Sequence, residues 1–211
     1  MTYRAASAAS GKRPTREHLL KLEEIKKAAA RQFYAIGYSG TDLRSIANEV
    51  GLHVSSLYSY ISGKEELLFL IMQDGMNAIT TSLDNACTST DPLERLRNSI
   101  LAHIMHHVER PFLAWTSHVE IRSLTGPYRD SIMRMRHDYE QRWLRILTDA
   151  RESGNLAEGY DLKLTMYGVL GLGISVANWY HPDGRLEGNE IASMLTTQVL
   201  NGLLPRSGAD N

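Results

Sequence analysis

The stretch Gly37–Leu67, GYSGTDLRSIANEVGLHVSSLYSYISGKEEL, determines the fold of the N-terminal third of this chain. It predicts a helix, a tight turn, a second short helix rich in Ser and Tyr, and the start of a third helix. The first of these helices has apolar residues at helical spacing: Leu43, Ile46, Ala47 and Val50. Gly51 follows them, where a left-handed residue commonly ends a helix. This layout is typical of a helix-turn-helix unit that reads duplex DNA.

The second helix of this stretch, about residues 54–60, carries the residues expected to contact DNA. Leu57 and Ile61 are expected to face the core, which leaves short hydroxyls and phenols outside to contact base edges and phosphates. Thr41 is expected to be the N-cap of the first helix of the motif. Lys64 is a cation in the first turn of the next helix and is expected to bind a phosphate. The candidate DNA-binding residues are Thr41, Arg44, His53, Val54, Ser55, Ser56, Tyr58, Ser59, Tyr60 and Lys64.

The same stretch resembles the DNA-binding domain of TetR-family transcriptional regulators. The matching positions are Gly37-Tyr38, Thr41, Ile46-Ala47, Gly51, Leu57-Tyr58, Tyr60, Lys64-Glu65 and Leu67. Val50, His53 and Ile61 depart from the family pattern, and His53 replaces the usual cap of the recognition helix. The resemblance implies an all-α fold of about nine helices, a repressor that binds a palindromic operator as a homodimer, and a variable C-terminal effector domain.

The remainder of the chain shows only helical punctuation. Asp91-Pro92-Leu93-Glu94 is a strong helix start, and Asp161 can cap a later helix. We therefore predict an all-α protein in three parts. Residues 1–13 form a disordered arm, residues 14–63 form a three-helix DNA-binding domain with the helix-turn-helix, and residues 64–211 form a helical effector-binding and dimerisation domain.

Charge is distributed unevenly, as expected for a DNA-binding protein. The net charge is −1, yet residues 1–67 hold 10 Lys and Arg against 7 Asp and Glu, whereas the remainder holds 13 against 17. A single cysteine, Cys87, and an N-terminus without an apolar signal segment predict a cytoplasmic protein. The uncharged run 164–180 is interpreted as a buried helix, with no membrane partner.

Small residues four apart in the second-to-last predicted helix suggest a close contact between subunits. A stripe of larger apolar residues lies on the last helix, and facing only the subunit's own core is the alternative for both. The expected dimer-interface residues are Gly171, Gly173, Ser175, Ala177, Ile191, Leu195 and Val199.

Aromatic and histidine side chains of the C-terminal part are candidates for an effector pocket. The expected effector-binding residues are His103, His107, Trp115, Tyr139, Trp143 and Tyr167. They favour a largely hydrophobic ligand with a polar or anionic end, such as an acyl-CoA thioester or an aromatic or steroidal acid. The alternative is an all-helical metal-binding protein or metalloenzyme, because His103 and His107 are four apart.

No nucleophile elbow, P-loop or dinucleotide fingerprint occurs in the sequence. We therefore predict a protein that is not an enzyme and has no cofactor and no metal. Its predicted partners are an operator in double-stranded DNA, a small-molecule effector and a second copy of the chain.

Overall fold

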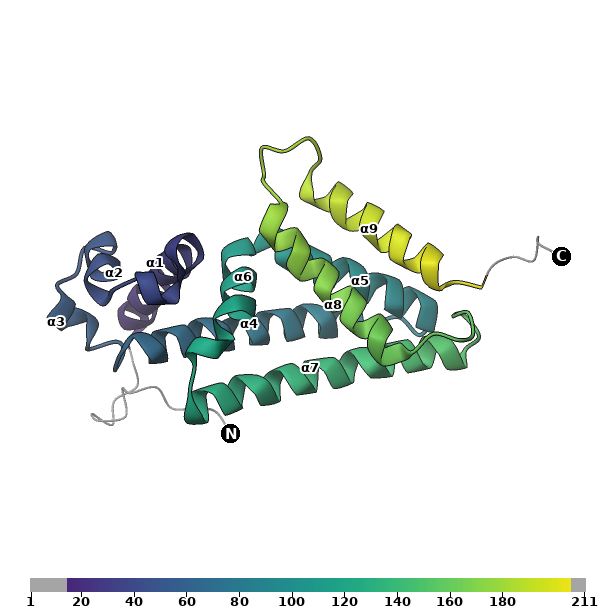
Figure 1. Cartoon of the computed structure of the whole chain (residues 1–211), viewed down its shortest axis with the longest axis horizontal. Helices are drawn as coiled ribbons and strands as arrows, with labels where there is room; N and C mark the ends of the chain where they lie inside the picture. The colour runs from purple at the N-terminus through teal and green to yellow at the C-terminus, as the bar shows by residue number, and fades with distance from the viewer. Residues whose placement is uncertain (1–14, 206–211) are drawn as a thin grey trace. The chain divides into compact units, whose positions relative to one another are not determined.

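The computed structural model describes residues 15–205, and within that range every regular element is helical. The predicted arm, residues 1–13, lies outside the described residues. The elements are α1 (Arg16–Gly40), α2 (Leu43–Glu49), α3 (Val54–Leu57), α4 (Lys64–Ala86), α5 (Pro92–Glu109), α6 (Pro111–Val119), the 3-10 helix η2 (Glu120–Ser123), α7 (Gly126–Glu152), α8 (Leu162–Trp179) and α9 (Gly188–Leu203) (Figure 1).

The helices form two compact units. The first unit reaches to Gly75 and includes Trp115–Ile132, and the second comprises Met76–Ala114 and the chain from Met133 onward. Both α4 and α7 therefore begin in the first unit and continue in the second. The first unit also includes the start of α4 and the segment Trp115–Ile132, and the domain boundary at residues 63/64 stays a prediction.

The first helix, α1, begins at a threonine cap and is interrupted near its end by a glycine. The Thr15 hydroxyl accepts a hydrogen bond from the His18 N–H at 3.2 Å, which satisfies one of the unpaired donors of the first turn. Gly37 has φ = 76°, a conformation that residues with a Cβ rarely adopt, and it interrupts α1.

The cap of α2 differs from the prediction. Asp42 Oδ1, rather than the Thr41 hydroxyl, accepts from the Ser45 N–H at 2.8 Å. Thr41 is only 2% exposed, and its hydroxyl donates to Gly37 O at 2.9 Å. Thr41 was the wrong choice because Asp and Thr are both good caps, and the sequence could not show that Thr41 turns inward.

The turn and the short second helix of the motif form as expected. Gly51 has φ = 68° and follows α2, and Leu57 and Ile61 are buried. The α-helical part of the recognition segment is short, Val54–Leu57, and is followed by a turn through Tyr60. His53 precedes this helix without donating or accepting a side-chain capping bond, as its departure from the family pattern suggested.

Polar side chains fix the start of α4 against α1. Both the Ser62 N–H and the Ser62 hydroxyl donate to the buried carboxylate of Glu66, at 2.5 and 2.6 Å. Lys26 of α1 is also buried and forms ion pairs with Glu23 and with Asp74 of α4. Burial alone would lower the pKa of Lys26, but the two carboxylates raise it above its usual value.

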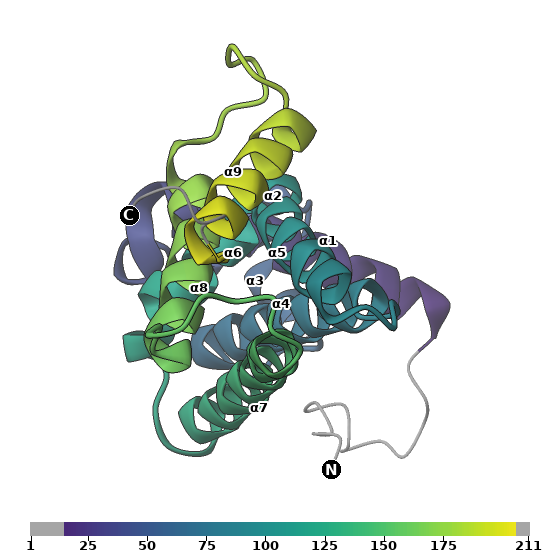
Figure 2. The same cartoon turned by 90° about the vertical axis from the view of Figure 1, so that its right-hand side faces the viewer.

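In the second unit, α8 and α9 both pack on α5 (Figures 1 and 2). The Asp91 and Asp161 carboxylates cap α5 and α8, as predicted. The apolar core of this unit draws on α4, α5, α7, α8 and α9, and Trp143 is its largest fully buried side chain. In the described residues, no helix is both long and apolar enough to span a membrane.

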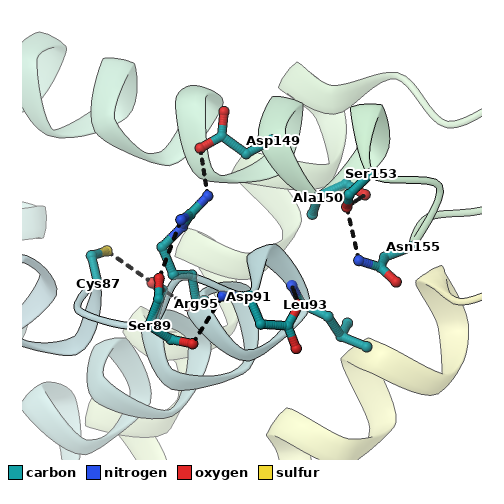
Figure 3. Close-up of polar contacts among 10 residues, drawn as sticks. Cys87, Ser89, Asp91, Leu93, Arg95, Asp149, Ala150, Ser153 and Asn155 are labelled. Carbon is teal, nitrogen blue, oxygen red and sulfur yellow. Dashed lines mark hydrogen bonds and ion pairs between the residues drawn. The ribbon is translucent and has the colours of Figure 1, made fainter.

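Arg95 ties the beginning of α5 to the end of α7 (Figure 3). Its guanidinium donates to the carbonyl oxygen of Ser89 at 3.2 Å and forms an ion pair with Asp149 at 2.9 Å. Because Asp149 is half-exposed, solvent screens this pair and its contribution is small. The pair orients the two helix ends more than it stabilises the core.

Gly173 of α8 packs directly against two histidine rings of α5. A Cβ at Gly173 would lie 2.5 Å from His103 Nε2 and 2.9 Å from His107 Nδ1, distances that real Cβ atoms do not show. The absence of a side chain therefore lets the two histidines lie against the backbone of α8.

We predict that Gly173→Ala destabilises the protein despite the better helix propensity of alanine. Displacing the His103 ring should lower the free energy of unfolding by roughly 1–3 kcal/mol. The higher helix propensity of alanine should raise it by about 1 kcal/mol. Gly202→Ala is the control, because a Cβ there meets nothing within 4 Å. Chemical unfolding followed by circular dichroism should show a lower midpoint for Gly173→Ala only, and equal midpoints for the two variants would contradict the close contact.

Candidate functional site

The helix-turn-helix presents a polar surface of exposed side chains. Of the ten predicted DNA-binding residues, six are exposed on α2 and the recognition segment: Arg44, His53, Ser55, Ser56, Tyr58 and Ser59. Tyr58 is 54% exposed, so its ring and its hydroxyl are open to solvent. Val54 and Tyr60 are partly buried beside them. The exposed side chains supply hydroxyls, an imidazole and a guanidinium, which are groups that contact phosphates and base edges.

Lys64 has a different position from the one that the sequence suggested. Its amine donates to the carbonyl oxygens of Tyr38 at 2.8 Å and Thr41 at 2.7 Å, and it lies 4.3 Å from the centroid of the Tyr38 ring. A cation in the first turn of α4 is thus explained by the carbonyl groups that it binds at the end of α1. These two bonds use two of the three donors of the ammonium group, and the contact of Lys64 with a DNA phosphate stays a prediction.

The start of α1 supports the recognition segment. The imidazole of His18 stacks on the Tyr60 ring, with centroids 4.4 Å apart and an interplanar angle of 19°. Lys21 Nζ donates to the carbonyl oxygen of Val50 at 3.2 Å, at the turn of the motif. Sequence reasoning missed both residues, because His18 and Tyr60 are far apart in the chain and no local pattern connects them.

Glu49, a carboxylate within the motif, is paired inside the first unit. Glu49, at the end of α2, accepts hydrogen bonds from Gln32 at 2.6 Å and Arg31 at 2.5 Å. The bond from Gln32 and then that from Arg31 hold the pKa of Glu49 below its usual value. This carboxylate therefore repels an approaching phosphate less than a free one would.

A segment from much later in the chain also holds the helix-turn-helix. The Tyr38 N–H donates to Glu120 Oε1 at 3.0 Å, and the Ser123 hydroxyl donates to the other carboxylate oxygen of Glu120 at 2.9 Å. Glu65 at the start of α4 accepts from the N–H and the hydroxyl of Thr125, at 2.6 and 2.8 Å. The connection between α6 and α7 is thus hydrogen-bonded to the C-terminal end of α1 and to the N-terminal end of α4.

A second candidate site lies inside the second unit, where four predicted effector residues meet. His103 Nδ1 and the Tyr139 hydroxyl are 2.9 Å apart, and the Trp143 ring meets the His103 ring edge-on at 5.7 Å between centroids. His107 lies 4.6 Å from His103, ring to ring, and its Nδ1 is 2.8 Å from the His103 carbonyl oxygen. All four side chains are at most 5% exposed. We call His103, His107, Tyr139 and Trp143 the histidine–aromatic cluster.

Burial sets the charge state of this region. Desolvation, assisted by the neighbouring His107, lowers the pKa of His103 well below its usual value and that of His106 to about 3. Desolvation likewise raises the pKa of Tyr139. At neutral pH His103, His106 and Tyr139 are therefore uncharged, and they can act only as hydrogen-bonding groups.

The metal-binding alternative is not supported. Among residues 15–205, no group of three or more His, Cys, Asp and Glu side chains is arranged to hold a metal ion. His103 instead uses both ring nitrogens within the fold, one with Tyr139 and the other, at 3.3 Å, with the carbonyl oxygen of Leu170. The four-residue spacing places His103 and His107 on one helix face, but that face is directed into the core.

Two predicted effector residues lie elsewhere. Tyr167 is 47% exposed on α8, with the Lys163 amine 6.0 Å from its ring centroid. Trp115 is partly buried on α6 and belongs to the first unit. Aromatic residues recur on several faces of these helices, so composition alone did not separate them.

The predicted dimer residues divide between two faces of α8 and the inner face of α9. Gly171 and Ser175 are exposed, whereas Gly173 and Ala177 are buried inside the subunit. The apolar stripe of α9 also packs into the core of its own unit: Ile191, Leu195 and Val199. Gly173, Ala177 and Ile191 are thus buried within their own subunit, whereas the interface stays a prediction for the partly buried Leu195 and Val199.

Both parts of the chain match family models. Residues 25–71 match "Bacterial regulatory proteins, tetR family", and residues 89–203, more than half of the chain, match "Tetracyclin repressor-like, C-terminal domain". The chain belongs to the TetR family. The helix-turn-helix lies within the residues that match the N-terminal model, and the histidine–aromatic cluster lies within those that match the C-terminal model.

Relatives in the TetR family are named transcriptional regulators. The HTH-type transcriptional repressor KstR2 of Mycolicibacterium smegmatis is 23% identical over 188 residues, covering 88% of this chain and 92% of KstR2. The fatty acid metabolism regulator protein of Bacillus subtilis is 22% identical over 187 residues, covering 86% and 96%.

Solved structures share the fold. The ketosteroid transcriptional regulator KstR2 of Mycobacterium tuberculosis superposes with a TM-score of 0.82 at 21% identity, covering 93% of this chain and 98% of that one. AibR, solved in complex with isovaleryl coenzyme A and operator DNA, superposes with a TM-score of 0.74 at 27% identity, covering 84% and 97%.

We predict that Lys64→Ala lowers the free energy of unfolding by roughly 1.5–3 kcal/mol, because it removes hydrogen bonds from a charged donor to two carbonyl groups. Lys27→Ala, which removes an exposed cation of α1, should change it by less than about 0.5 kcal/mol. DNA affinity should fall with stability in Lys64→Ala while the salt dependence of binding stays unchanged. A slope shallower by about one would instead identify Lys64 as a phosphate contact.

Proposed function

We propose that this protein is a ligand-responsive transcriptional repressor that binds a palindromic operator as a homodimer and acts in the cytoplasm. The observation that carries the proposal is the exposed α2–α3 surface, where Arg44, Tyr58 and the serines stand outside a helix-turn-helix core. A two-fold dimer would set two such surfaces in successive major grooves, roughly 34–36 Å apart or one further turn away. The names of its relatives support repression as the sign of regulation.

The dimer contact is proposed to form through the exposed face of α8, which would pack against a second copy of the chain. Leu164, Gly168, Gly171 and Ser175 share one helical face and are all exposed, and Leu164 is 72% exposed. A Cβ at Gly168 or Gly171 would meet nothing within 4 Å, so nothing in the subunit itself requires these glycines. A second backbone approaching this strip would require them, as small residues do at close helix crossings.

The effector is proposed to be a small, largely hydrophobic molecule held in the second unit around the histidine–aromatic cluster. Its binding would favour a dimer whose recognition surfaces are wrongly spaced for the operator. A coupling free energy on the order of 1–3 kcal/mol is sufficient for such regulation. Acyl-CoA thioesters and aromatic or steroidal acids are the leading classes.

Operator binding can be tested without knowing the operator. Genomic fragments retained by the purified protein should be enriched in a palindrome, which then serves as the probe in titrations at several salt concentrations. We predict that Arg44→Ala weakens binding and makes the log–log salt slope shallower by about one. Arg151→Ala, an equal charge change at an exposed position of α7, should leave affinity and slope unchanged. Retention without any enriched sequence, or equal effects of the two variants, would refute the proposed operator surface.

The α8 contact makes a separate prediction. Gly171→Leu should convert the dimer to monomer or weaken it at least tenfold, because a bulky side chain enters a close helix crossing. The subunit itself has room for the leucine, so its helical content should be retained. Arg145→Leu adds the same side chain at an exposed position of α7 and should remain dimeric. Sedimentation equilibrium of both variants decides the matter: a Gly171→Leu dimer of normal affinity would exclude this face.

A further inference from the structure

The recognition segment, Val54–Tyr60, has little structure of its own to fix its orientation. Its α-helical part is a single turn, Val54–Leu57, and the side chain of His53 makes no capping bond at its start. A helix this short is not stable by itself in water. Leu57 and Ile61 anchor its inner side in the core. The position of the outer side chains therefore depends on contacts from other elements.

Two side chains of α1 make such contacts, one at each end of the recognition segment. The His18 ring stacks on the Tyr60 ring, with centroids 4.4 Å apart and an interplanar angle of 19°. Lys21 Nζ donates to the carbonyl oxygen of Val50 at 3.2 Å, at the turn that precedes the segment. Lys21 is itself held by an ion pair with Glu24 at 2.6 Å. His18 and Lys21 are three residues apart, so one face of α1 meets the chain on both sides of α3.

The Tyr60 hydroxyl forms no hydrogen bond within residues 15–205, although its side chain is partly buried. Its oxygen remains in contact with solvent. Tyr58 and Ser59, the preceding residues, are exposed. Stacking of two flat rings restricts the rotation of the phenol about its side-chain bonds, so the hydroxyl is held in one place. A donor that is already ordered loses less conformational entropy when it meets an acceptor.

A DNA phosphate is the acceptor that this phenol fits best. The Tyr60 ring is held against α1 at the end of the recognition segment, so it does not extend with the exposed serines toward the base edges. Phosphates line the rim of the groove, and contacts to them set the register of a protein on the duplex. A hydrogen bond from a hydroxyl to a charged oxygen is stronger than one to a neutral oxygen.

We propose that His18 is a positioning residue for operator binding: by stacking on Tyr60, it holds the phenol so that the hydroxyl donates to a DNA phosphate. The inference rests on the proposed operator surface and adds a residue of α1 to it. The recognition segment depends on this support because its helix has only one turn. His18 acts through Tyr60 and does not itself bind DNA.

A double-mutant cycle on the full-length protein separates positioning from general stabilisation of the fold. Operator dissociation constants are measured for wild type, His18→Ala, Tyr60→Phe and the double variant, with the palindromic fragment that wild-type protein retains. Tyr60→Phe removes only the hydroxyl and should weaken binding roughly tenfold or more, because a dimer loses two hydrogen bonds to charged acceptors. His18→Ala should weaken binding about fivefold when the hydroxyl is present and less than about twofold when it is absent.

Two further variants show whether the flat ring is what matters. His18→Phe keeps a ring that can stack on Tyr60 and should bind the operator within about twofold of wild type. His137→Ala removes the same side chain as His18→Ala at an exposed position of α7 and should leave the affinity unchanged. If circular dichroism shows that His18→Ala does not fold, His18→Leu replaces it in the cycle, because leucine keeps an apolar contact without a flat ring.

Four outcomes would overturn the positioning role. They are normal affinity of Tyr60→Phe, additive effects of the two substitutions, failure of His18→Phe to restore binding, and a log–log salt slope shallower by about one in His18→Ala. The last result would assign the imidazole to a phosphate of its own. In each of these cases wild-type protein still binds its operator, so the proposed function stands. Wild-type protein that retains no specific DNA refutes the proposed function and this inference together.

Discussion

The arrangement of the helix-turn-helix depends on how the chain is closed around the break at Gly37. The positive φ of this glycine turns the chain out of α1 and leaves backbone groups without helical partners. The Thr41 hydroxyl donates a hydrogen bond to the Gly37 carbonyl oxygen. The Lys64 amine donates to the carbonyl oxygens of Tyr38 and Thr41. The Glu120 carboxylate accepts from the Tyr38 N–H. These groups come from three separate parts of the chain, so the orientation of α2 and α3 on α1 is set by tertiary contacts.

The same bonds offer a physical route for regulation. Lys64 and Glu65 begin α4, and Thr125 immediately precedes α7, and both helices continue into the second unit. A ligand that changes the preferred position of α7 there acts on a helix whose first residues are bonded to Glu65 through Thr125. Such coupling requires only that the ligand bind two conformations with different affinities.

Local signals in the sequence predicted most of the fold, and distant partners account for its errors. Gly51, Asp91 and Asp161 were assigned correctly because a cap or a helix stop depends on neighbours within a few residues. The carbonyl partners of Lys64 lie 23 and 26 residues away, so no local pattern indicated them. Glu120 gave no signal at all, since its bond to Tyr38 spans 82 residues. The sequence could identify the cation at the helix start but not the carbonyl groups that it binds.

The sites in the second unit show the same limit in a different form. Helical spacing placed Gly171 with Ser175 and Gly173 with Ala177, but it could not tell which pair faces the core, because both pairs are small and uncharged. In the structure Gly173 packs against His103 and His107, whereas Gly171 is exposed. Spacing likewise put His103 and His107 on one face and suggested a metal. The Tyr139 hydroxyl and the Leu170 carbonyl, both from other helices, turn that face into a neutral hydrogen-bonding cluster. A buried cluster whose members are hydrogen-bonded to one another specifies how the surrounding helices pack.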